Sequence, residues 1–110
     1  MTDPLATDWF VVEVQWRGIL LPYYHLSGVA TGHELIPDGH RFISTAMQWI
    51  SRPRRQAQTR NRLYRLGREC TLSEIRATDY QRIADYLDQL WSPPAAMRLA
   101  VAYPEHLKPD

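Results

Sequence analysis

Apolar and polar residues alternate along FVVEVQWR, residues 10–17, with the period of two that is typical of an extended strand. The apolar positions on one face of that strand are Phe10, Val12, Val14 and Trp16. The opposite face mixes Val11 with polar residues, so we expect a half-buried strand that ends at Gly18. The preceding residues 1–8 lack this pattern, and we expect them to form a flexible tail.

Turn-forming residues punctuate the next part of the chain. The stretch at 19–35 is rich in aliphatic and aromatic residues and contains Pro22, which has no N–H for a sheet ladder. We therefore expect one or two extended segments with an edge or irregular position at the proline. Pro-Asp-Gly at 37–39 predicts a tight turn, because proline presets φ and Asp-Gly tolerates a positive φ. A new element then begins at Arg41.

The stretch RFISTAMQWI, residues 41–50, fits both a helical and an alternating apolar spacing. We favour a strand because the stretch is short, contains β-branched and aromatic residues, and is bounded by turn signals. The sequence SRPRR then forms a bend, and QTRNRLYRLG forms a returning strand that ends at Gly67. Residues 51–68 are therefore expected to form the turn of a β-hairpin and the second strand of that hairpin.

The clearest helical pattern lies between residues 72 and 91. TLSE at 71–74 matches a capping box, in which Thr71 bonds the amide of Glu74 and the Glu74 carboxylate reaches back. Apolar residues then recur at i, i+3, i+4 and i+7, which indicates one core-facing side. They are Tyr80, Ile83, Ala84, Leu87, Leu90 and Trp91. Two prolines after Ser92 end the helix.

These elements predict an α+β fold, in which a small antiparallel β-sheet is packed by one amphipathic C-terminal helix. The sheet covers about residues 9–68 and the helix about residues 72–91, within a single domain at 9–92. Residues 93–110 form a C-terminal extension, in which AAMRLAVAY could be a short helix or a last strand. A length of 110 residues and a hydrophobic content of 45% fit one globular core.

Other features of the composition narrow the setting of the protein. No apolar run approaches the roughly 20 residues that span a bilayer, and the N-terminus carries acids where a signal peptide needs positive charge. We therefore expect a cytoplasmic protein with no membrane partner. Cys70 is the single cysteine, which excludes a disulfide within the chain, and burial is the commoner fate of such a residue.

Positive charge is concentrated in residues 52–68, which hold seven arginines and no acid. The two flanks each carry a net charge of −3, so the whole chain is +1. Guanidinium groups match phosphate oxygens with a fork of donors, and a tyrosine beside them could stack on a base. Alternatively, the run is a solvated edge whose charges pair with the acidic flanks. The candidate partner-binding residues are Arg52, Arg54, Arg55, Arg60, Arg62, Tyr64 and Arg65.

Metal binding and catalysis have less support in the spacing of residues. The residue types that bind metals gather around the Pro-Asp-Gly turn, namely His25, His33, Glu34, Asp38 and His40. Their spacing matches no known metal motif, and polar residues collect at turns in any case. Ser44, Thr45 and Cys70 lack a nucleophile elbow or a placed base. We therefore expect a protein that is not an enzyme, with no catalytic residues, no metal and no cofactor.

Residues 32–67 also contain a longer pattern. TGHELIPDGHRFISTAMQWI followed by TRNRLYRLGR resembles small β-rich proteins of phages and other mobile elements. In that pattern a glycine and a Pro-Asp-Gly turn lead into a strand with Ser-Thr, and a second strand carries Thr-Arg-x-x-x-Tyr-x-Leu-Gly. The matching positions are Gly32, Pro37, Asp38, Gly39, Ser44, Thr45, Thr59, Arg60, Tyr64, Leu66 and Gly67. The resemblance implies a fold element and a genomic setting in which host-defence inhibition, including anti-CRISPR activity, is one role.

Two functional hypotheses follow from these observations. The first is a small non-enzymatic binding protein of a phage or mobile element, an anti-CRISPR-like inhibitor that occludes a host protein or ribonucleoprotein complex sterically and electrostatically. The alternative is a nucleic-acid-binding regulator whose arginine-rich hairpin, residues 52–68, lies along a phosphate backbone. The sheet edge could also pair two copies into a homodimer. A third class, a small hydrolase or metal enzyme, would need the upstream histidines and nearby acids to converge in a pocket.

Overall fold

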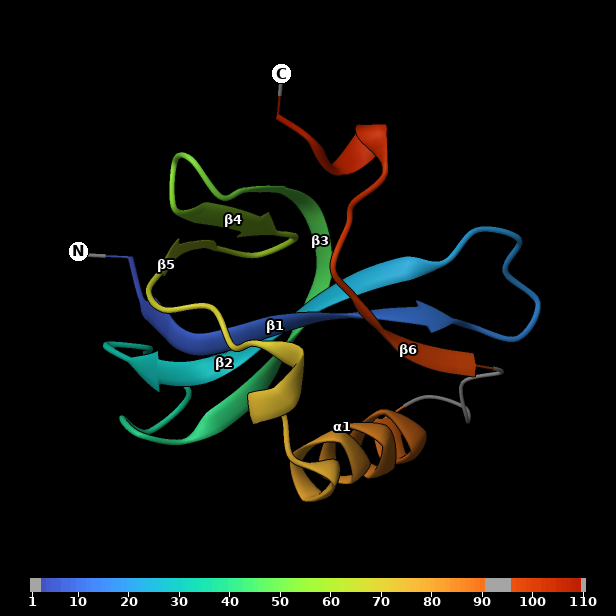
Figure 1. Cartoon of the computed structure of the whole chain (residues 1–110), viewed down its shortest axis with the longest axis horizontal. Helices are drawn as coiled ribbons and strands as arrows, with labels where there is room; N and C mark the ends of the chain where they lie inside the picture. The colour runs from blue at the N-terminus through green and yellow to red at the C-terminus, as the bar shows by residue number, and fades with distance from the viewer. Residues whose placement is uncertain (1–2, 91–95, 110) are drawn as a thin grey trace.

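The computed structural model describes residues 3–90 and 96–109, and Figure 1 shows how their elements are arranged. The elements are β1 (Leu5–Gln15), β2 (Tyr23–Thr31), β3 (Arg41–Ser51), β4 (Gln56–Thr59), β5 (Leu63–Leu66), η1 (Leu72–Glu74), α1 (Ala77–Leu90), β6 (Ala96–Ala100) and η2 (Glu105–Leu107). The elements η1 and η2 are short 3₁₀ turns. The described part of the chain thus holds six strands, mostly antiparallel, and one α-helix, which confirms the α+β class.

The sheet closes on itself around β1. Its strand order is β2-β3-β4-β5-β1-β6, and β1 also pairs with β2, so the first five strands form a closed ring. Antiparallel neighbours alternate in direction, and an odd number of strands therefore leaves β1 parallel to β5, with Leu5 opposite Arg65. Further along the same edge of β1, Val11–Gln15 lies opposite Ala96–Ala100 of β6.

Both faces of β1 are buried, against two different sets of residues. Inside the ring, Val11 packs with Leu26 and Phe42. Outside the ring lies α1, which Figure 1 shows beneath the sheet. The main residues of this helix-facing cluster are Phe10, Val12, Val14, Trp16, Ile83 and Leu87. The apolar face expected for residues 10–16 is therefore the helix-facing side, and the mixed face looks into the ring.

Gly28 allows β1 and β2 to approach closely at an irregular point of their pairing. The register between the two strands shifts between Thr7 and Phe10, and Asp8 adopts a φ of 48° there. A Cβ atom on Gly28 would lie only 3.0 Å from the Cβ atom of Ala6. A residue without a side chain is therefore needed opposite this bulge.

The strands extend beyond the range expected from the sequence. The expectation of a flexible tail at 1–8 is wrong for Leu5–Thr7, which pair with β2, because the partners that order this segment are distant in sequence. The expected C-terminal extension also belongs to the fold, since β6 pairs with β1 and Leu107 is buried in the inner core. Residues 1–2, 91–95 and 110 lie outside the described part of the chain.

The hairpin and the helix also differ in detail from the expectation. The single return strand expected before Gly67 is divided into β4 and β5, because the chain turns between them, where the Thr59 N–H donates to the Arg62 carbonyl at 2.9 Å. The helix begins at Ala77 rather than 72. The Glu74 carboxylate does accept the Thr71 N–H at 2.9 Å, but this capping box lies at the start of η1 and not at the start of α1.

Two local expectations are confirmed. Residues 41–50 form a strand, within β3, and the Pro-Asp-Gly sequence forms a turn in which Gly39 has a φ of 83°. Within the described residues, α1 is too short and too polar to cross a bilayer, and no other helix is long enough either.

Candidate interaction surface

The arginines of residues 52–68 do not form one continuous surface, because the β4–β5 hairpin separates them. The end before β4 carries Arg54, Arg55 and Arg65. The end after β4 carries Arg60 and Arg62. A strand rises about 3.3 Å per residue, so these two ends are on the order of 15 Å apart. The hairpin therefore presents two separate basic ends.

Arg52 uses its guanidinium group within the fold. The group donates two hydrogen bonds of 2.9 Å to the Glu69 carboxylate and one of 3.0 Å to the Tyr103 hydroxyl. It also donates to the Val101 carbonyl at 3.1 Å and lies 4.6 Å from the centre of the Tyr103 ring. Hydrogen bonding to Glu69 raises the pKa of Arg52 further above its usual value. Arg52 therefore ties the β3–β4 turn to the C-terminal segment.

Tyr64 is a core residue and is only 3% exposed. Its ring stacks on Phe42 with centroids 5.1 Å apart and planes at 13°. Its hydroxyl lies 3.0 Å from Nε2 of His33, and burial raises the pKa of that hydroxyl. The expectation that Tyr64 stacks on a nucleic-acid base is therefore wrong, because protein atoms cover the ring.

Acids from other parts of the chain neutralise several of the remaining charges. Arg62 forms an ion pair of 3.1 Å with Glu34, and its side chain is mostly buried. Arg68 contacts both Asp8 and Glu74, at 2.7 and 2.6 Å. The interpretation in which the basic run pairs with its acidic flanks therefore holds for Arg52, Arg62 and Arg68.

The basic end before β4 remains accessible. Arg54, Arg55 and Arg65 are all exposed, and the Arg55 carbonyl accepts the Leu66 N–H at 2.8 Å, which holds the two strands together there. The Arg65 guanidinium donates to the backbone carbonyl of Asp3 at 3.1 Å. A backbone carbonyl has no formal charge, so this contact does not neutralise the guanidinium. This end is the part of the hairpin that could contact a phosphate backbone.

The connection between β1 and β2 exposes apolar side chains. Figure 1 shows it extending away from α1 and from the β4–β5 hairpin. Its exposed apolar residues are Ile19, Leu20 and Leu21, and Tyr23 at the start of β2 is exposed beside them. Leu20 is 97% and Leu21 70% exposed. The Ile19 N–H donates to the Trp16 carbonyl at 3.3 Å and the Ile19 carbonyl accepts from Gln15, so the turn has fixed internal contacts. We call residues 17–23 the hairpin tip.

A pocket of about 310 Å³ opens beside the hairpin tip. It is lined by Trp16, Arg17, Ile19, Tyr23, His25, Thr45, Ala46 and Arg60. Arg17 and Arg60 supply its positive charge, and no acid belongs to this lining among the described residues. Arg60, in the turn between β4 and β5, lines the same pocket as Ile19 and Tyr23. We call the hairpin tip, the pocket and Arg60 together the tip surface.

His25 forms a rigid, neutral wall of this pocket. It is 1% exposed, its Nδ1 lies 2.9 Å from the Ser44 carbonyl oxygen, and its ring meets Trp16 edge to face at 6.1 Å. Burial lowers the pKa of His25 below its usual value, which favours the neutral ring near pH 7. The Ser44 Oγ bonds the Leu26 N–H and the Thr45 carbonyl instead of the ring. These contacts do not activate Ser44 as a nucleophile.

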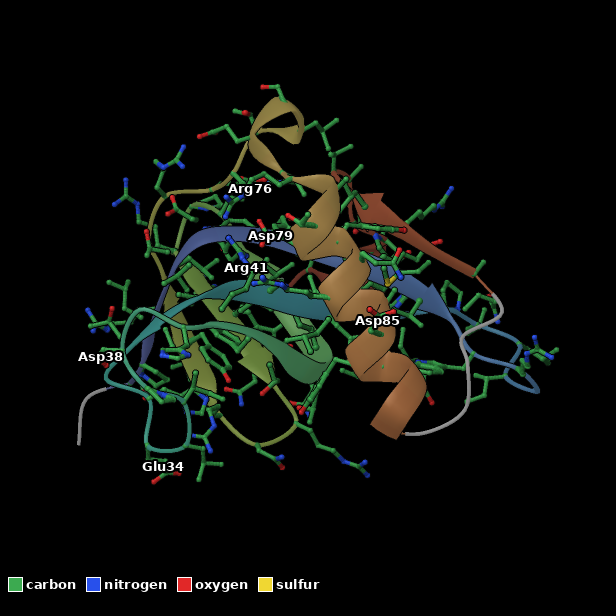
Figure 2. The ribbon with its side chains drawn as sticks, turned by 90° about the horizontal axis from the view of Figure 1, so that it is seen from below. Glu34, Asp38, Arg41, Arg76, Asp79 and Asp85 are labelled. Carbon is green, nitrogen blue, oxygen red and sulfur yellow. The ribbon has the colours of Figure 1, made fainter. Side chains whose placement is uncertain are left out.

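A second pocket, of about 380 Å³, lies between α1 and β3, and two of its charged residues, Arg41 and Asp79, have partners within the fold. Figure 2 shows Asp79 on α1 and Arg41 next to the helix, and both residues line this pocket. Arg41 donates to the Asp8 carbonyl at 2.8 Å and lies 5.0 Å from the centre of the Phe10 ring. Asp79 accepts a hydrogen bond of 3.2 Å from Arg76. These contacts give Arg41 and Asp79 a structural role within the fold.

The residues considered for metal binding and catalysis also have structural contacts. In residues 3–90 and 96–109, no group of three His, Cys, Asp or Glu side chains gathers as a metal ion would require. Figure 2 shows Glu34 and Asp38 on the β2–β3 connection, where Asp38 accepts the Gly32 N–H at 2.9 Å. Burial raises the pKa of the Cys70 thiol, which disfavours the reactive thiolate.

Comparisons of the chain with known protein families, with curated proteins and with solved structures find no match.

Arg60 is predicted from the sequence as a contact residue, whereas its apolar neighbours in the tip surface are not. The signal for them is present in RGILLPYY, where an apolar run lies between two turn formers, Gly18 and Pro22. Hydrophobicity alone assigns Ile19–Leu21 to a core, but turn formers on both sides assign the run to a loop. Apolar residues in a loop are the combination that indicates an exposed contact surface.

Proposed function

We propose that this chain is a non-enzymatic binding protein that contacts a partner protein through the tip surface. The observation that carries the proposal is the exposure of Leu20 and Leu21 next to a pocket with two arginines on its lining. Contiguous exposed apolar side chains mark interaction sites on soluble domains. Aromatic residues and arginine are also the residue types enriched in protein interfaces, and this surface supplies Trp16, Tyr23 and Arg60.

The phage-like pattern of residues 32–67 supports a narrower proposal about the partner. It suggests a component of a host defence complex, which the chain would inhibit in an anti-CRISPR-like manner by covering a working surface. The apolar hairpin tip would supply the steric part of that inhibition. Arg17 and Arg60 would supply the electrostatic part, which favours association with an acidic patch.

Site-specific crosslinking tests the proposed contact directly. A photoreactive phenylalanine derivative replaces Leu20 in one sample and Leu72 in a control sample. Leu72 is a good control because it is also apolar and 59% exposed, but lies in η1 and outside the tip surface. After irradiation in a bacterial host lysate, we expect discrete crosslinked proteins only from position 20.

Competition decides whether these crosslinks are specific. Excess unlabelled wild-type protein should remove the crosslinked bands, whereas excess of the double variant Leu20→Ser, Leu21→Ser should leave them. The two leucines are so exposed that the double variant should keep the wild-type melting temperature. Equal crosslinking from both positions, or competition by the double variant, would contradict the proposal.

The exposed basic end before β4 supports a second candidate, binding of nucleic acid through Arg54, Arg55 and Arg65. Three phosphate contacts predict a slope of about −2.7 for log affinity against log salt on duplex DNA. Fluorescence anisotropy with labelled duplex DNA, single-stranded DNA and RNA measures this slope. Changing the three arginines to glutamine should abolish binding, and changing Arg17 and Arg60 to glutamine should have little effect. Absence of binding at low salt would exclude this candidate.

A further inference from the structure

The lining of the tip pocket indicates the chemistry of its occupant. Trp16, Ile19 and Tyr23 provide apolar walls, and His25 is neutral and fixed through its bond to Ser44. The only formal charges on the described lining are the guanidinium groups of Arg17 and Arg60. An apolar pocket with two cations and no anion is complementary to an apolar group that carries negative charges beside it.

The size of the pocket suits side chains better than a large cofactor. Its volume of about 310 Å³ is near the lower limit for pockets that hold drug-sized ligands, which start at about 300 Å³. An apolar cavity of about 150 Å³ already accommodates benzene. The pocket therefore has room for one or two apolar side chains of a peptide segment.

The positions of the arginines extend this complementarity along the chain of the occupant. Arg17 lies in the connection between β1 and β2, whereas Arg60 lies in the turn after β4, so the two cations come from separate parts of the fold. A segment that places an apolar side chain between them can place acidic residues on both of its sides. Guanidinium groups bind carboxylates with a fork of donors, and this adds orientation to the attraction.

We propose that the tip pocket binds an acidic peptide segment of the partner protein, with a large apolar side chain in the pocket and flanking carboxylates on Arg17 and Arg60. This inference rests on the proposed function and specifies the partner chemistry of the same surface. The acidic segment is favoured over a phosphate backbone because nucleic acid offers no aliphatic anchor. It is favoured over a lipid surface because the apolar residues line a pocket as well as a protruding loop.

The test uses fluorescein-labelled peptides and the full chain. The first peptide has a Leu-Phe pair between glutamates, the second replaces the glutamates with glutamine, and the third replaces Leu-Phe with Ser-Ser. We expect anisotropy to show salt-sensitive binding of the first peptide. The second should bind about tenfold more weakly at low salt, as two exposed ion pairs allow, and the third should not bind.

Variants identify the two parts of the site separately. Changing Arg17 and Arg60 to glutamine should lower the affinity for the acidic peptide about tenfold and leave the affinity for the glutamine peptide unchanged. Changing Arg55 and Arg65 to glutamine is the matched control, which removes the same charge outside the pocket and should change neither affinity. Ala46→Phe places a ring in the pocket and should abolish binding of both peptides. Tyr23→Ser provides a second pocket variant if Ala46→Phe lowers the melting temperature.

The outcomes separate this inference from the proposed function. Equal affinity for the acidic and glutamine peptides, or full competition by anionic lipid vesicles or duplex DNA, would overturn the acidic-segment inference. Failure of all peptides together with persistent crosslinking from position 20 would overturn it while leaving the proposed function in place. Failure of the peptides and of tip-specific crosslinking would overturn both. A shift of the Trp16 indole N–H signal on addition of the acidic peptide, identified with Trp16→Phe, would confirm the site.

Discussion

The Tyr64 hydroxyl lies 3.0 Å from Nε2 of His33, and this contact fixes the β2–β3 connection to β5. His33 also meets the ring of Phe42, which itself stacks on Tyr64. The three rings form a cluster near the turn between β4 and β5. Tyr64 therefore stabilises the shape of this end, whereas its exposed neighbour Arg60 is available for contact.

Substitutions of Tyr64 separate its ring from its hydroxyl. Tyr64→Phe loses the bond to His33 alone and should lower the free energy of unfolding by about 0.5–1.5 kcal/mol. Tyr64→Ala removes a buried ring and should cost about 3–5 kcal/mol. Urea unfolding measures both values. Equal losses for the two variants would contradict the assignment of the ring to the core.

Arg52 and Arg60 should respond differently to the same substitution. Arg52→Gln removes the paired hydrogen bonds to Glu69 and the contact with Tyr103, and should cost about 1–2 kcal/mol after allowance for partial exposure. Arg60→Gln should change the free energy of unfolding by less than about 0.5 kcal/mol. Thermal and urea unfolding check this difference. A stability loss of the same size at both positions would be inconsistent with the structural role of Arg52.

The close approach of β1 and β2 predicts a destabilising effect of Gly28→Ala. The new Cβ atom would lie 3.0 Å from the Cβ atom of Ala6, and the variant should lose about 1–3 kcal/mol of stability. Ala6→Gly removes the opposing atom. The loss in free energy of unfolding for the double variant should therefore be smaller than the sum of the losses for the two single variants, by at least about 0.5 kcal/mol. Strict additivity in urea unfolding would argue against this contact.

Two histidines should make stability depend on pH between 7.5 and 5.5. Burial lowers the pKa of His25 and of His33, so below their unfolded value of 6.5 the unfolded chain binds more protons than the folded chain. The melting temperature should therefore fall as pH decreases through this window. His25→Gln should reduce this dependence, because it removes one of the two groups. A melting temperature that rises on acidification would contradict the sign.

Local patterns predict the elements of this fold better than their ends. Alternation at residues 10–16, turn chemistry at 37–39 and β-branched residues at 41–50 all identify structure that is present. The early start of β1 and the pairing of β6 could not be predicted, because both depend on partners more than 20 residues away. Alternation within one strand indicates which side chains share a face, but it does not indicate which distant strand is the partner.

The candidate site is predictable only in part, for a similar reason. The concentration of arginine is visible in the sequence, but its division into two ends follows from the turn between β4 and β5. The acids that engage the arginines are remote as well, since Glu34 meets Arg62 and Glu69 meets Arg52. Charge counting along the chain cannot distinguish a paired guanidinium from an accessible one.

One edge of β1 pairs with two different strands, β5 and β6, and this determines when β1 can complete its pairing. Leu5 has its partner at Arg65, and Val11 has its partner at Ala100, so β1 cannot complete its hydrogen bonds until segments far along the chain are available. Until then that edge is open, and its apolar residues can pair with a strand of another chain. Folding dominated by such distant contacts is slow. The strand that is easiest to recognise in the sequence is thus protected along this edge by two strands that are distant from it in the chain, β5 and β6.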